Sequence, residues 1–206
     1  MSHNKKENKK EQILSAASEC FARFGYKKTT LDDIGEKSGL NKASIYYYFE
    51  SKEEIFTTIV LNEFKQFITK LHQNIEEDMD CEQKILVYFK EKLHYWFQKS
   101  MILPQITEIE PEKLQHLMMA SGLKTFLKIE QEEKSFVANI LKNCIKKGQI
   151  KDCNVEKMSA FMFALVDGIK DNCERFTRNK FPTSPEHENM IKDVQTALKI
   201  FINGLK

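Results

Sequence analysis

The stretch TTLDDIGEKSGLNKASIYYYFESKEE, residues 29–54, decides the fold of this chain. Two short helices are predicted in it, over Leu31–Ser38 and Lys42–Phe49, and each follows a polar residue that can cap its first turn. Gly39 stands between them, where a residue free to adopt a left-handed conformation can end the first helix. Two short helices joined by a turn of about three to four residues are typical of a helix-turn-helix.

The second of these helices has two unlike faces when its residues are placed about 100° apart. Ile45 and Phe49 fall together and predict the face that turns toward the core. The residues predicted to face away from the core are Ala43, Ser44 and Tyr47, with Tyr46 and Tyr48 on either flank. Three consecutive tyrosines cannot all be buried on so short a helix, so at least one ring is expected to be exposed and to need a partner.

A DNA major groove suits this outer face. The small side chains of Ala43 and Ser44 permit close approach to base edges, and Tyr47 can reach a base edge or a thymine methyl group. The hydroxyl groups of the two flanking tyrosines can reach phosphates, Lys42 can reach past the helix end, and Lys52 adds a phosphate contact. Two alternatives stay open: the flanking tyrosines pack against neighbouring helices, and the two lysines are ordinary solvated side chains.

The rest of the chain predicts an all-α protein of about nine helices, with three short ones at the start and a helical bundle after them. Apolar residues recur at helical spacing almost throughout, and the 7 glycines and 4 prolines are too few for a turn-rich sheet protein. Outside residues 29–54, helices are expected at Glu7–Phe24, from Ser51 onward, from Asp80 onward, and at 111–119, 122–147, 155–177 and 185–205, with an irregular segment at 100–111.

Composition and motifs exclude several classes of protein. The sequence has no glycine-rich phosphate loop, no Cys-x-x-Cys pair and no His-x-x-x-His spacing, so we predict no enzymatic activity, no cofactor and no metal. The longest uncharged apolar run, residues 158–166, is far shorter than the ~20 residues of a membrane span. The five cysteines are expected to be reduced and buried, and no secretory signal is recognised, which predicts a cytoplasmic protein.

Positive charge is concentrated at the start of the chain. Residues 1–52 carry a net charge of +3, whereas residues 53–206 carry −1. This asymmetry favours nucleic acid or another acidic surface as the partner of the N-terminal quarter. The lysines before residue 11 could extend that contact as a basic arm, but a disordered solubilising tail is the favoured interpretation.

Residues 8–55 resemble the DNA-binding domain of the TetR family of transcriptional repressors. The matching residues are Ala17 and Phe21, Phe24-Gly25-Tyr26, Thr29-Thr30, Asp33-Ile34, Gly39-Leu40, Ile45-Tyr46-Tyr47-Tyr48-Phe49 and Ser51-Lys52-Glu53. By this resemblance the phosphate-contacting residues are Thr29 or Thr30, Tyr46, Tyr48 and Lys52, and the groove-facing residues are Lys42, Ala43, Ser44 and Tyr47. Two positions depart from the family: Gly35 replaces the usual alanine, which should loosen its helix by about 1 kcal/mol, and Asn41 replaces a common serine.

The resemblance also implies a dimer, whose C-terminal helices form the interface and enclose a ligand cavity. The expected division is a helix-turn-helix DNA-binding domain at residues 1–52 and a helical ligand-binding and dimerisation domain at residues 53–206. The residues predicted to line the cavity are Phe89, Trp96, Phe97, Met118 and Phe126, which favour a large apolar or aromatic ligand. The residues predicted at the dimer interface are Met162, Leu165, Ile169, Val194, Leu198 and Phe201, unless both stripes pack within one protomer.

These features together predict a dimeric, sequence-specific transcriptional regulator that binds double-stranded DNA. The favoured form is a repressor released from a palindromic operator by a small apolar or aromatic molecule. The alternatives are a ligand-independent or activating regulator of the same fold and, in a different class, a helical protein-interaction module in which the tyrosines dock a protein. Phosphate-driven binding weakens steeply with salt, so salt dependence on duplex DNA separates the last alternative from the others.

Overall fold

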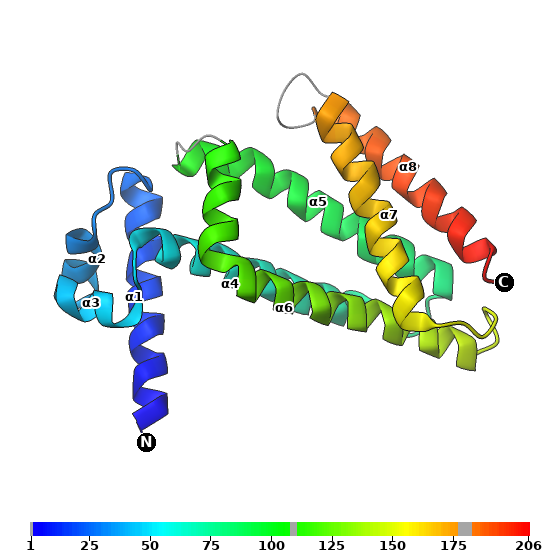
Figure 1. The fold of residues 1–206 in the computed structure, drawn as a ribbon, viewed down its shortest axis with the longest axis horizontal. Helices are drawn as coiled ribbons and strands as arrows, with labels where there is room; N and C mark the ends of the chain where they lie inside the picture. The colour runs from blue at the N-terminus through cyan, green and yellow to red at the C-terminus, as the bar shows by residue number, and fades with distance from the viewer. Residues whose placement is uncertain (1, 108–110, 177–182) are drawn as a thin grey trace. The chain divides into compact units, whose positions relative to one another are not determined.

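The structure, a computed structural model, describes residues 2–107, 111–176 and 183–206, and every regular element in these ranges is an α-helix (Figure 1). The helices are α1 (Ser2–Phe24), α2 (Leu31–Ser38), α3 (Lys42–Tyr48), α4 (Lys52–Asn74), α5 (Cys81–Thr107), α6 (Pro111–Lys146), α7 (Val155–Phe176) and α8 (Ser184–Asn203). The all-α prediction is confirmed. Within these ranges no helix combines the length and the apolar character needed to cross a membrane.

The described ranges hold eight helices where the sequence predicts about nine, because α6 is one continuous helix. The predicted break between residues 119 and 122 does not occur. A Cβ atom at Gly122 would lie 2.5 Å from Cγ2 of Thr57 and 2.7 Å from Cδ1 of Leu61, both on α4. This glycine therefore permits a close approach of α6 to α4, and it does not end the helix.

The ends of two other helices also differ from the prediction. α1 begins at Ser2, so the prediction of a disordered tail before residue 11 is wrong for residues 2–10, which are helical. α5 continues through Pro104 to Thr107, inside the segment predicted to be irregular. Residues 108–110 of that segment lie outside the described residues. Pro111 begins α6, a position at which its missing N–H is not needed.

The chain divides into two compact units. The first comprises Met1–Lys65 and Ile102–Phe126, and the second comprises Gln66–Met101 and Leu127–Lys206. These units are defined by packing, whereas the expected division between residues 52 and 53 separates a DNA-binding function from ligand binding and dimerisation. That functional division stays a prediction.

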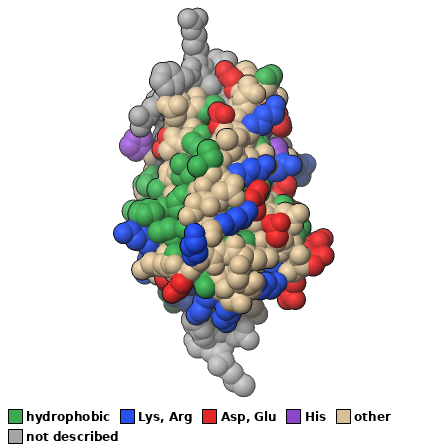
Figure 2. Space-filling model, turned by 90° about the vertical axis from the view of Figure 1, so that its right-hand side faces the viewer, with side chains coloured by type: hydrophobic (Ala, Val, Ile, Leu, Met, Phe, Trp, Pro, Cys, Tyr) green, Lys and Arg blue, Asp and Glu red, His purple; other side chains and the backbone are tan. Residues whose placement is uncertain are grey.

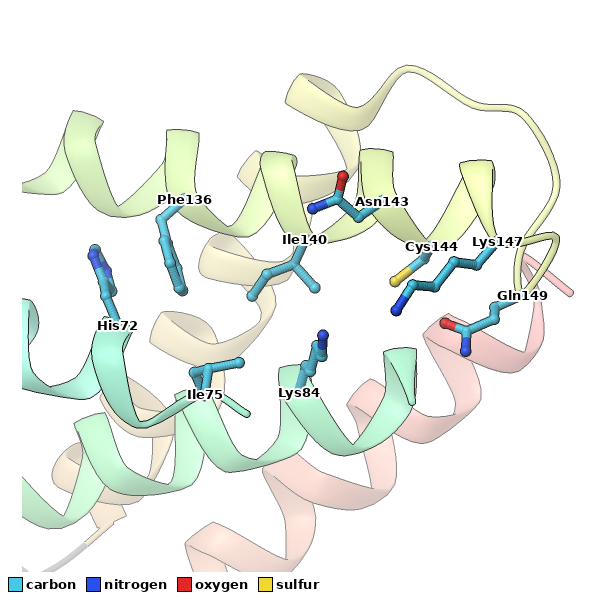
Figure 3. Close-up of a pocket in the computed structure, with 9 residues that line it drawn as sticks. All are labelled: His72, Ile75, Lys84, Phe136, Ile140, Asn143, Cys144, Lys147 and Gln149. Atoms are coloured by element: carbon cyan, nitrogen blue, oxygen red, sulfur yellow. The ribbon is translucent and has the colours of Figure 1, made fainter. Parts of the chain in front are cut away.

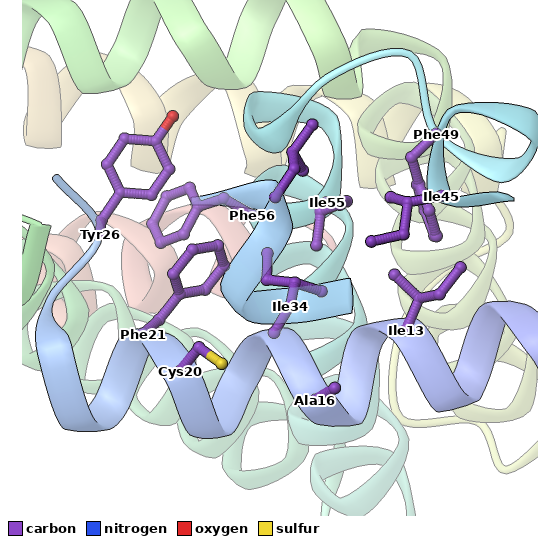
Figure 4. Packing of buried hydrophobic residues seen from close by; sticks show 12 residues of the cluster. Ile13, Ala16, Cys20, Phe21, Tyr26, Ile34, Ile45, Phe49, Ile55 and Phe56 are labelled. Carbon is purple, nitrogen blue, oxygen red and sulfur yellow. The ribbon is translucent and has the colours of Figure 1, made fainter. Parts of the chain in front are cut away.

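One hydrophobic cluster holds α1, α2, α3 and the start of α4 together (Figure 4). Its buried members are Ile13, Ala16, Ala17, Cys20, Phe21, Tyr26, Leu31, Ile34, Ile45, Phe49, Ile55 and Phe56. The rings of Phe21, Tyr26 and Phe56 contact one another, with centroids 4.9 to 5.8 Å apart. Burying an aliphatic or aromatic side chain of this size contributes roughly 1.5–3 kcal/mol, so this cluster stabilises helices that are too short to persist alone.

A buried ionic network lies inside the second unit. The carboxylate of Glu133 on α6 accepts a hydrogen bond from the Tyr88 hydroxyl at 2.7 Å and pairs with Lys92 Nζ at 2.9 Å, both on α5. Burial raises the pKa of Tyr88, and the nearby charge of Glu133 raises it further, so the hydroxyl remains a donor. A buried carboxylate is strongly destabilising without such partners, and the network therefore fixes how α5 and α6 pair.

A disulfide joins Cys81, the first residue of α5, to Cys144 near the end of α6. Their Cα atoms lie 5.7 Å apart although 63 positions separate them in the sequence. The prediction that every cysteine is reduced is therefore wrong for this pair, whereas Cys20 and Cys153 are free thiols. The spacing of the cysteines gives no sign of the bond, because only the pairing of two helix ends brings these residues together.

We expect a reducing agent to lower the free energy of unfolding by about 2–4 kcal/mol, because the disulfide closes a long loop in the unfolded chain. Urea denaturation with and without the reductant measures the difference. The double variant Cys81→Ala/Cys144→Ala should show no response to the reductant, and Cys153→Ala should respond like the wild type. Equal stability of the wild type under both conditions would contradict the bond.

His187, in the first turns of α8, is a buried titratable group of the second unit. Its ring stacks on Phe97 with centroids 4.0 Å apart, and its Nε2 lies 3.2 Å from Nδ1 of His94. Its Nδ1 is buried and has no hydrogen-bond partner among the residues that the structure describes. Burial lowers the pKa of His187, the neighbouring His94 lowers it further, and Glu188 opposes both. The folded protein therefore favours the neutral ring.

We expect the free energy of unfolding to fall as the pH is lowered from about 7 to about 5.5. In the unfolded chain a histidine titrates near about pH 6.5, whereas His187 in the folded protein titrates lower, so between the two values the unfolded chain binds more protons. For one proton, the free energy of unfolding can fall by about 1.4 kcal/mol for each pH unit. Urea denaturation at several pH values measures this slope.

The variant His187→Phe keeps an aromatic ring against Phe97 and cannot take up a proton. It should flatten the slope in part, because burial also lowers the pKa of His72. The control His116→Gln changes an exposed histidine and should leave the slope as it is. A wild-type slope in His187→Phe would show that this ring is not responsible.

Candidate nucleic-acid interface

The two helices of the helix-turn-helix are each capped by the residue that precedes them. The backbone N–H of Thr30 donates to Asp33 Oδ2 at 2.7 Å, and the Thr30 hydroxyl accepts from the Asp33 N–H at 3.2 Å, which makes a capping box at the start of α2. The hydrogen bonds from Thr30 hold the pKa of Asp33 below its usual range. At the start of α3, Asn41 Oδ1 accepts from the Ser44 N–H at 2.8 Å. Both predicted N-caps are confirmed.

The turn between α2 and α3 depends on two glycines. Gly39 ends α2 with φ of +66°, a conformation that glycine adopts at no steric cost. A Cβ atom at Gly35 would lie 2.7 Å from the carbonyl oxygen of Leu40 in the same turn. Since the Leu40 N–H also donates to the Gly35 carbonyl at 2.9 Å, the turn closes directly on this glycine. Gly35, which we expected to loosen α2, therefore lets the turn pack closely.

The faces of α3 lie as the helical projection predicts. Ile45 is 0% exposed and Phe49 is 3% exposed, and both belong to the cluster that also contains Ile13 (Figure 4). Tyr46 is 51% exposed and Tyr47 is 69% exposed. Ala43 is exposed and Ser44 is half-buried on the outer side. The helix therefore presents two aromatic side chains and two small ones to solvent.

Tyr48 differs from its two neighbours. It is half-buried and packs against the hydrophobic cluster, and its ring meets the ring of Tyr47 edge-on with centroids 5.0 Å apart. Tyr48 thus packs within the protein, which is the alternative that the sequence left open for the two flanking tyrosines. This contact also fixes the position of Tyr47, since the more exposed ring rests against the less exposed one.

Lys42 forms a salt bridge at the surface of the protein. Its Nζ lies 3.1 Å from Oδ2 of Asp32, and both side chains are about half exposed or more. Surface pairs of this kind contribute at most about 1 kcal/mol, so a phosphate or a base edge can take the place of the carboxylate. Lys42 therefore remains available to a polyanion.

Thr29 and Lys52 lie together at the turn between α1 and α2. Thr29 is buried, and its hydroxyl is within hydrogen-bonding distance of the carbonyl oxygens of Gly25 (2.8 Å) and Cys20 (3.1 Å). Lys52 Nζ donates to the carbonyl oxygens of Thr29 at 2.8 Å and Tyr26 at 2.9 Å. Burial lowers the pKa of Lys52, against the nearby Glu53. Both side chains thus have a structural use in addition to any contact with phosphate.

A second contact attaches the first turn of α4 to the same turn of chain. The hydroxyl of Tyr26 donates to Oε1 of Glu53 at 2.9 Å, and Lys52 Nζ lies 4.4 Å from the centroid of the Tyr26 ring. Residues 52 and 53 therefore hold the segment after α1 at two points. Any reorientation of the start of α4 must move this segment or break these contacts.

The helical start of α1 adds cations that the sequence analysis assigned to a tail. Lys6 Nζ lies 5.2 Å from the centroid of the Tyr47 ring, and Lys10 Nζ lies 5.7 Å from that of Phe49. These lysines thus stand beside α3 on the same surface. The signal that could have placed them is the pair of good helix formers, Lys5 and Lys6, directly before the predicted helix start at Glu7.

The residues predicted to line a ligand cavity have different surroundings. Phe89 is buried against Phe163, Phe97 stacks on His187, and Trp96 is half-buried with Lys170 Nζ 5.4 Å from its ring centroid. Phe126 is 41% exposed. The side chain of Met118 lies outside the described residues. Among the residues that can be described, no group of three or more His, Cys, Asp or Glu side chains could hold a metal ion.

The predicted dimer residues fall into two groups. Met162, Val194 and Leu198 are buried within the protomer, so the alternative of packing inside one chain applies to them. Leu165, Ile169 and Phe201 are half-buried. Sequence reasoning missed the large apolar side chains that are more exposed on the same two helices, Phe161 on α7 and Ile200 on α8.

Comparison with known proteins identifies the family of this part of the chain. The family model "Bacterial regulatory proteins, tetR family" matches residues 13–59. The biofilm operon icaADBC HTH-type negative transcriptional regulator IcaR of Staphylococcus epidermidis is 37% identical over 81 residues, which cover 39% of this chain and 44% of that protein.

Two crystal structures show the same fold over nearly the whole chain. A transcriptional regulator from Cytophaga hutchinsonii matches with a TM-score of 0.68 and 22% identity, covering 95% of this chain and 97% of that one. The transcriptional regulator FadR from Bacillus subtilis in complex with stearoyl-CoA matches with a TM-score of 0.52 and 18% identity, covering 95% of this chain and 99% of that one.

The family model spans the second half of α1, α2, the turn, α3 and the first turns of α4, and so it includes the helix that carries the exposed tyrosines. The family consists of transcriptional regulators and not of enzymes. The chain therefore carries the DNA-binding domain of the TetR family of transcriptional regulators.

Proposed function

We propose that this protein binds a twofold-symmetric operator as a dimer, and that each protomer inserts α3 into a major groove. The observation that carries the proposal is that Tyr46 and Tyr47 are exposed on a helix whose opposite face is buried. In such a dimer the two reading helices are about 34–36 Å apart, one turn of DNA, or a small multiple of that distance. The proposed partner is double-stranded DNA in the cytoplasm, and the proposed function requires no cofactor.

The residues of this surface divide by what each can reach. Tyr47, with Ala43 and Ser44 beside it, is proposed to contact base edges, and Lys42 is proposed to reach the groove after leaving Asp32. Contacts to phosphate are proposed for Tyr46, Tyr48, Thr30 and Lys52, and Lys6 extends them from α1. Thr30 is preferred to Thr29 because Thr29 is buried with its hydroxyl bonded inside the protein.

We further propose that the protein is a repressor whose operator affinity falls when the C-terminal domain binds a small molecule. Support comes from the relative named as a negative regulator and from the neighbour solved with stearoyl-CoA. The contacts of Lys52 and Glu53 with the α1–α2 turn supply a route, because a tilt of α4 would displace the reading head. A coupling of about 1–3 kcal/mol between ligand and operator is expected.

The proposed dimer surface is the outer face of α7 and α8. Hydrophobic side chains gather in a patch on the face that Figure 2 shows, with positively charged side chains beside them. Phe161, Leu165 and Gly168 lie at helical spacing along one side of α7, and a Cβ at Gly168 would meet no other atom within 4 Å. That open space permits close approach by a partner helix, to which α8 would add Ile200 and Phe201.

The selection of bound duplexes from a random pool tests the operator proposal. We expect a motif with twofold symmetry whose half-sites are centred about 10 base pairs, or a small multiple of that number, apart. Binding to the selected duplex should weaken steeply with salt. A motif without twofold symmetry would overturn the dimeric arrangement, and salt-independent binding would overturn the phosphate contacts.

The variant Tyr47→Ala should lose base preference at one or two positions of the selected motif, at a cost of about 1–3 kcal/mol there, because its ring is proposed to contact bases. The matched variant Tyr46→Ala, on the same helix and also exposed, should weaken binding to all sequences alike. Titrations of a panel of singly substituted duplexes measure both effects. A changed base preference in Tyr46→Ala, together with an unchanged one in Tyr47→Ala, would reverse the two roles.

The variant Phe161→Asp should shift the protein toward monomer, because it places a charge in the proposed apolar interface. Sedimentation equilibrium measures the change, and operator affinity at low protein concentration should fall with it. Lys90→Asp introduces the same side chain at an exposed position of α5 and should leave the dimer intact. A dimer of wild-type strength in Phe161→Asp would remove α7 from the interface.

A further inference from the structure

A cavity of about 150 Å³ lies in the second unit, between the end of α4, the start of α5 and the end of α6. Figure 3 shows side chains of α6 pointing across it toward side chains of α4 and α5. The five residues named above as the predicted lining of a ligand cavity, Phe89, Trp96, Phe97, Met118 and Phe126, do not line this one. Its lining therefore has to be interpreted on its own chemistry.

Two lysines at this cavity hold their positive charges close together. Lys84 Nζ, on α5, and Lys147 Nζ, just after α6, lie 3.0 and 3.5 Å from the same acceptor, the backbone carbonyl oxygen of Glu77. Within the described part of the chain, no carboxylate is paired with either ammonium group. Both contacts are exposed to solvent and the carbonyl is neutral, so neither positive charge is neutralised by the protein and this end of the cavity is accessible to an anion.

The contrast with Lys92 in the same unit supports this interpretation. Lys92 is paired with Glu133 at 2.9 Å, so its charge is balanced inside the protein. Lys84 and Lys147 each retain ammonium protons beyond the one directed at the shared carbonyl oxygen. Hydrogen bonds between a charged donor and a charged acceptor are roughly twice as strong as neutral ones, so an anionic oxygen is the acceptor that these protons favour.

His72 adds an unused polar atom beside an aromatic wall. Its ring stacks on Phe136 with centroids 3.5 Å apart and an interplanar angle of 6°. Its Nε2 is buried and has no hydrogen-bond partner among the described residues. Burial lowers the pKa of His72, against the opposing charge of Glu132, which favours the neutral ring, and Nε2 of a neutral ring can donate or accept a hydrogen bond.

The remaining lining is mixed, because Asn143 and Gln149 add polar side chains to an apolar part. Ile75, Ile140 and the face of Phe136 form this apolar wall between the histidine and the lysines. An inorganic anion would leave these surfaces without a partner, whereas an apolar molecule would leave the two ammonium groups without one. The two halves of the lining are satisfied together by one molecule that has a charged end and a short apolar body.

We propose that this cavity binds a small organic anion, a carboxylate with a short aromatic or aliphatic body. The carboxylate lies between Lys84 and Lys147, and the body lies against Phe136 and Ile140. The ligand class differs from the large apolar molecule expected from the sequence, because the cavity is small and cationic at one end. The inference deepens the effector part of the proposed function and depends on that function only for its consequence at the operator.

Calorimetric titration of the full-length protein with benzoate and with hexanoate tests the site without DNA. At least one of the two carboxylates should bind, whereas benzyl alcohol, hexanol and inorganic phosphate should bind at least tenfold more weakly. Equal binding of the alcohols would overturn the role of the lysines, and equal binding of phosphate would overturn the role of the apolar wall. No heat of binding by either carboxylate up to about 10 mM would overturn the site itself.

Lysine variants locate the site on the protein. Lys84→Gln and Lys147→Gln should each weaken carboxylate binding about tenfold or more, whereas Lys147→Arg, which keeps the charge, should bind within about threefold of the wild type. The control Lys146→Gln removes the adjacent lysine, which is exposed like Lys147 but does not line the cavity, and it should change nothing. A loss in Lys146→Gln equal to that in Lys147→Gln would reduce the effect to net charge and overturn the site.

Operator binding is measured separately, so the two proposals fail in distinguishable ways. Carboxylate binding with unchanged operator affinity supports the site and removes only the effector role. Operator binding with no carboxylate binding overturns the site and leaves the DNA-binding proposal as it is.

Discussion

The burial of Ile45 and Phe49 is the constraint on which the reading head depends. α3 has only seven residues, so it is far too short to be stable by itself. Its one buried face sets the rotation of the helix, and that rotation alone decides that Tyr46 and Tyr47 face solvent. A rotation by one residue, about 100°, would bury a tyrosine and expose an aliphatic side chain. The DNA-facing surface is therefore specified by the residues on its opposite side.

This part of the fold could be predicted because every signal in it is local. The N-cap bond from Asn41 spans three residues, and the faces of α3 follow from helical spacing alone. The predictions failed where a contact between distant segments outweighs a local signal. A glycine often marks the end of a helix, yet Gly122 lies inside α6 because α4 approaches closely there. The Cys81–Cys144 bond also depends on a long-range pairing, and no spacing rule reveals it.

The candidate sites show the same limit more sharply. Periodicity identifies an apolar stripe on α7, but it cannot say whether Met162 packs inside the protomer or against a partner, and the structure places it inside. A lysine in the first turn of a helix suggests a phosphate contact. The two carbonyl oxygens that Lys52 binds come from 23 and 26 residues earlier in the chain, so its structural use is invisible in the sequence.

Structural lysines differ from lysines that are available to a ligand in how the protein compensates their positive charges. Lys92 is neutralised by a buried carboxylate, and Lys52 is held by two carbonyls within a packed turn. Lys84 and Lys147 share a single carbonyl, which is the weakest compensation of the three. α4 carries Lys52 in its first turn and His72 in its last, so one helix holds both a support of the reading head and a wall of the cationic cavity. The proposed ligand would therefore contact the same helix whose first turn is hydrogen-bonded to the α1–α2 turn.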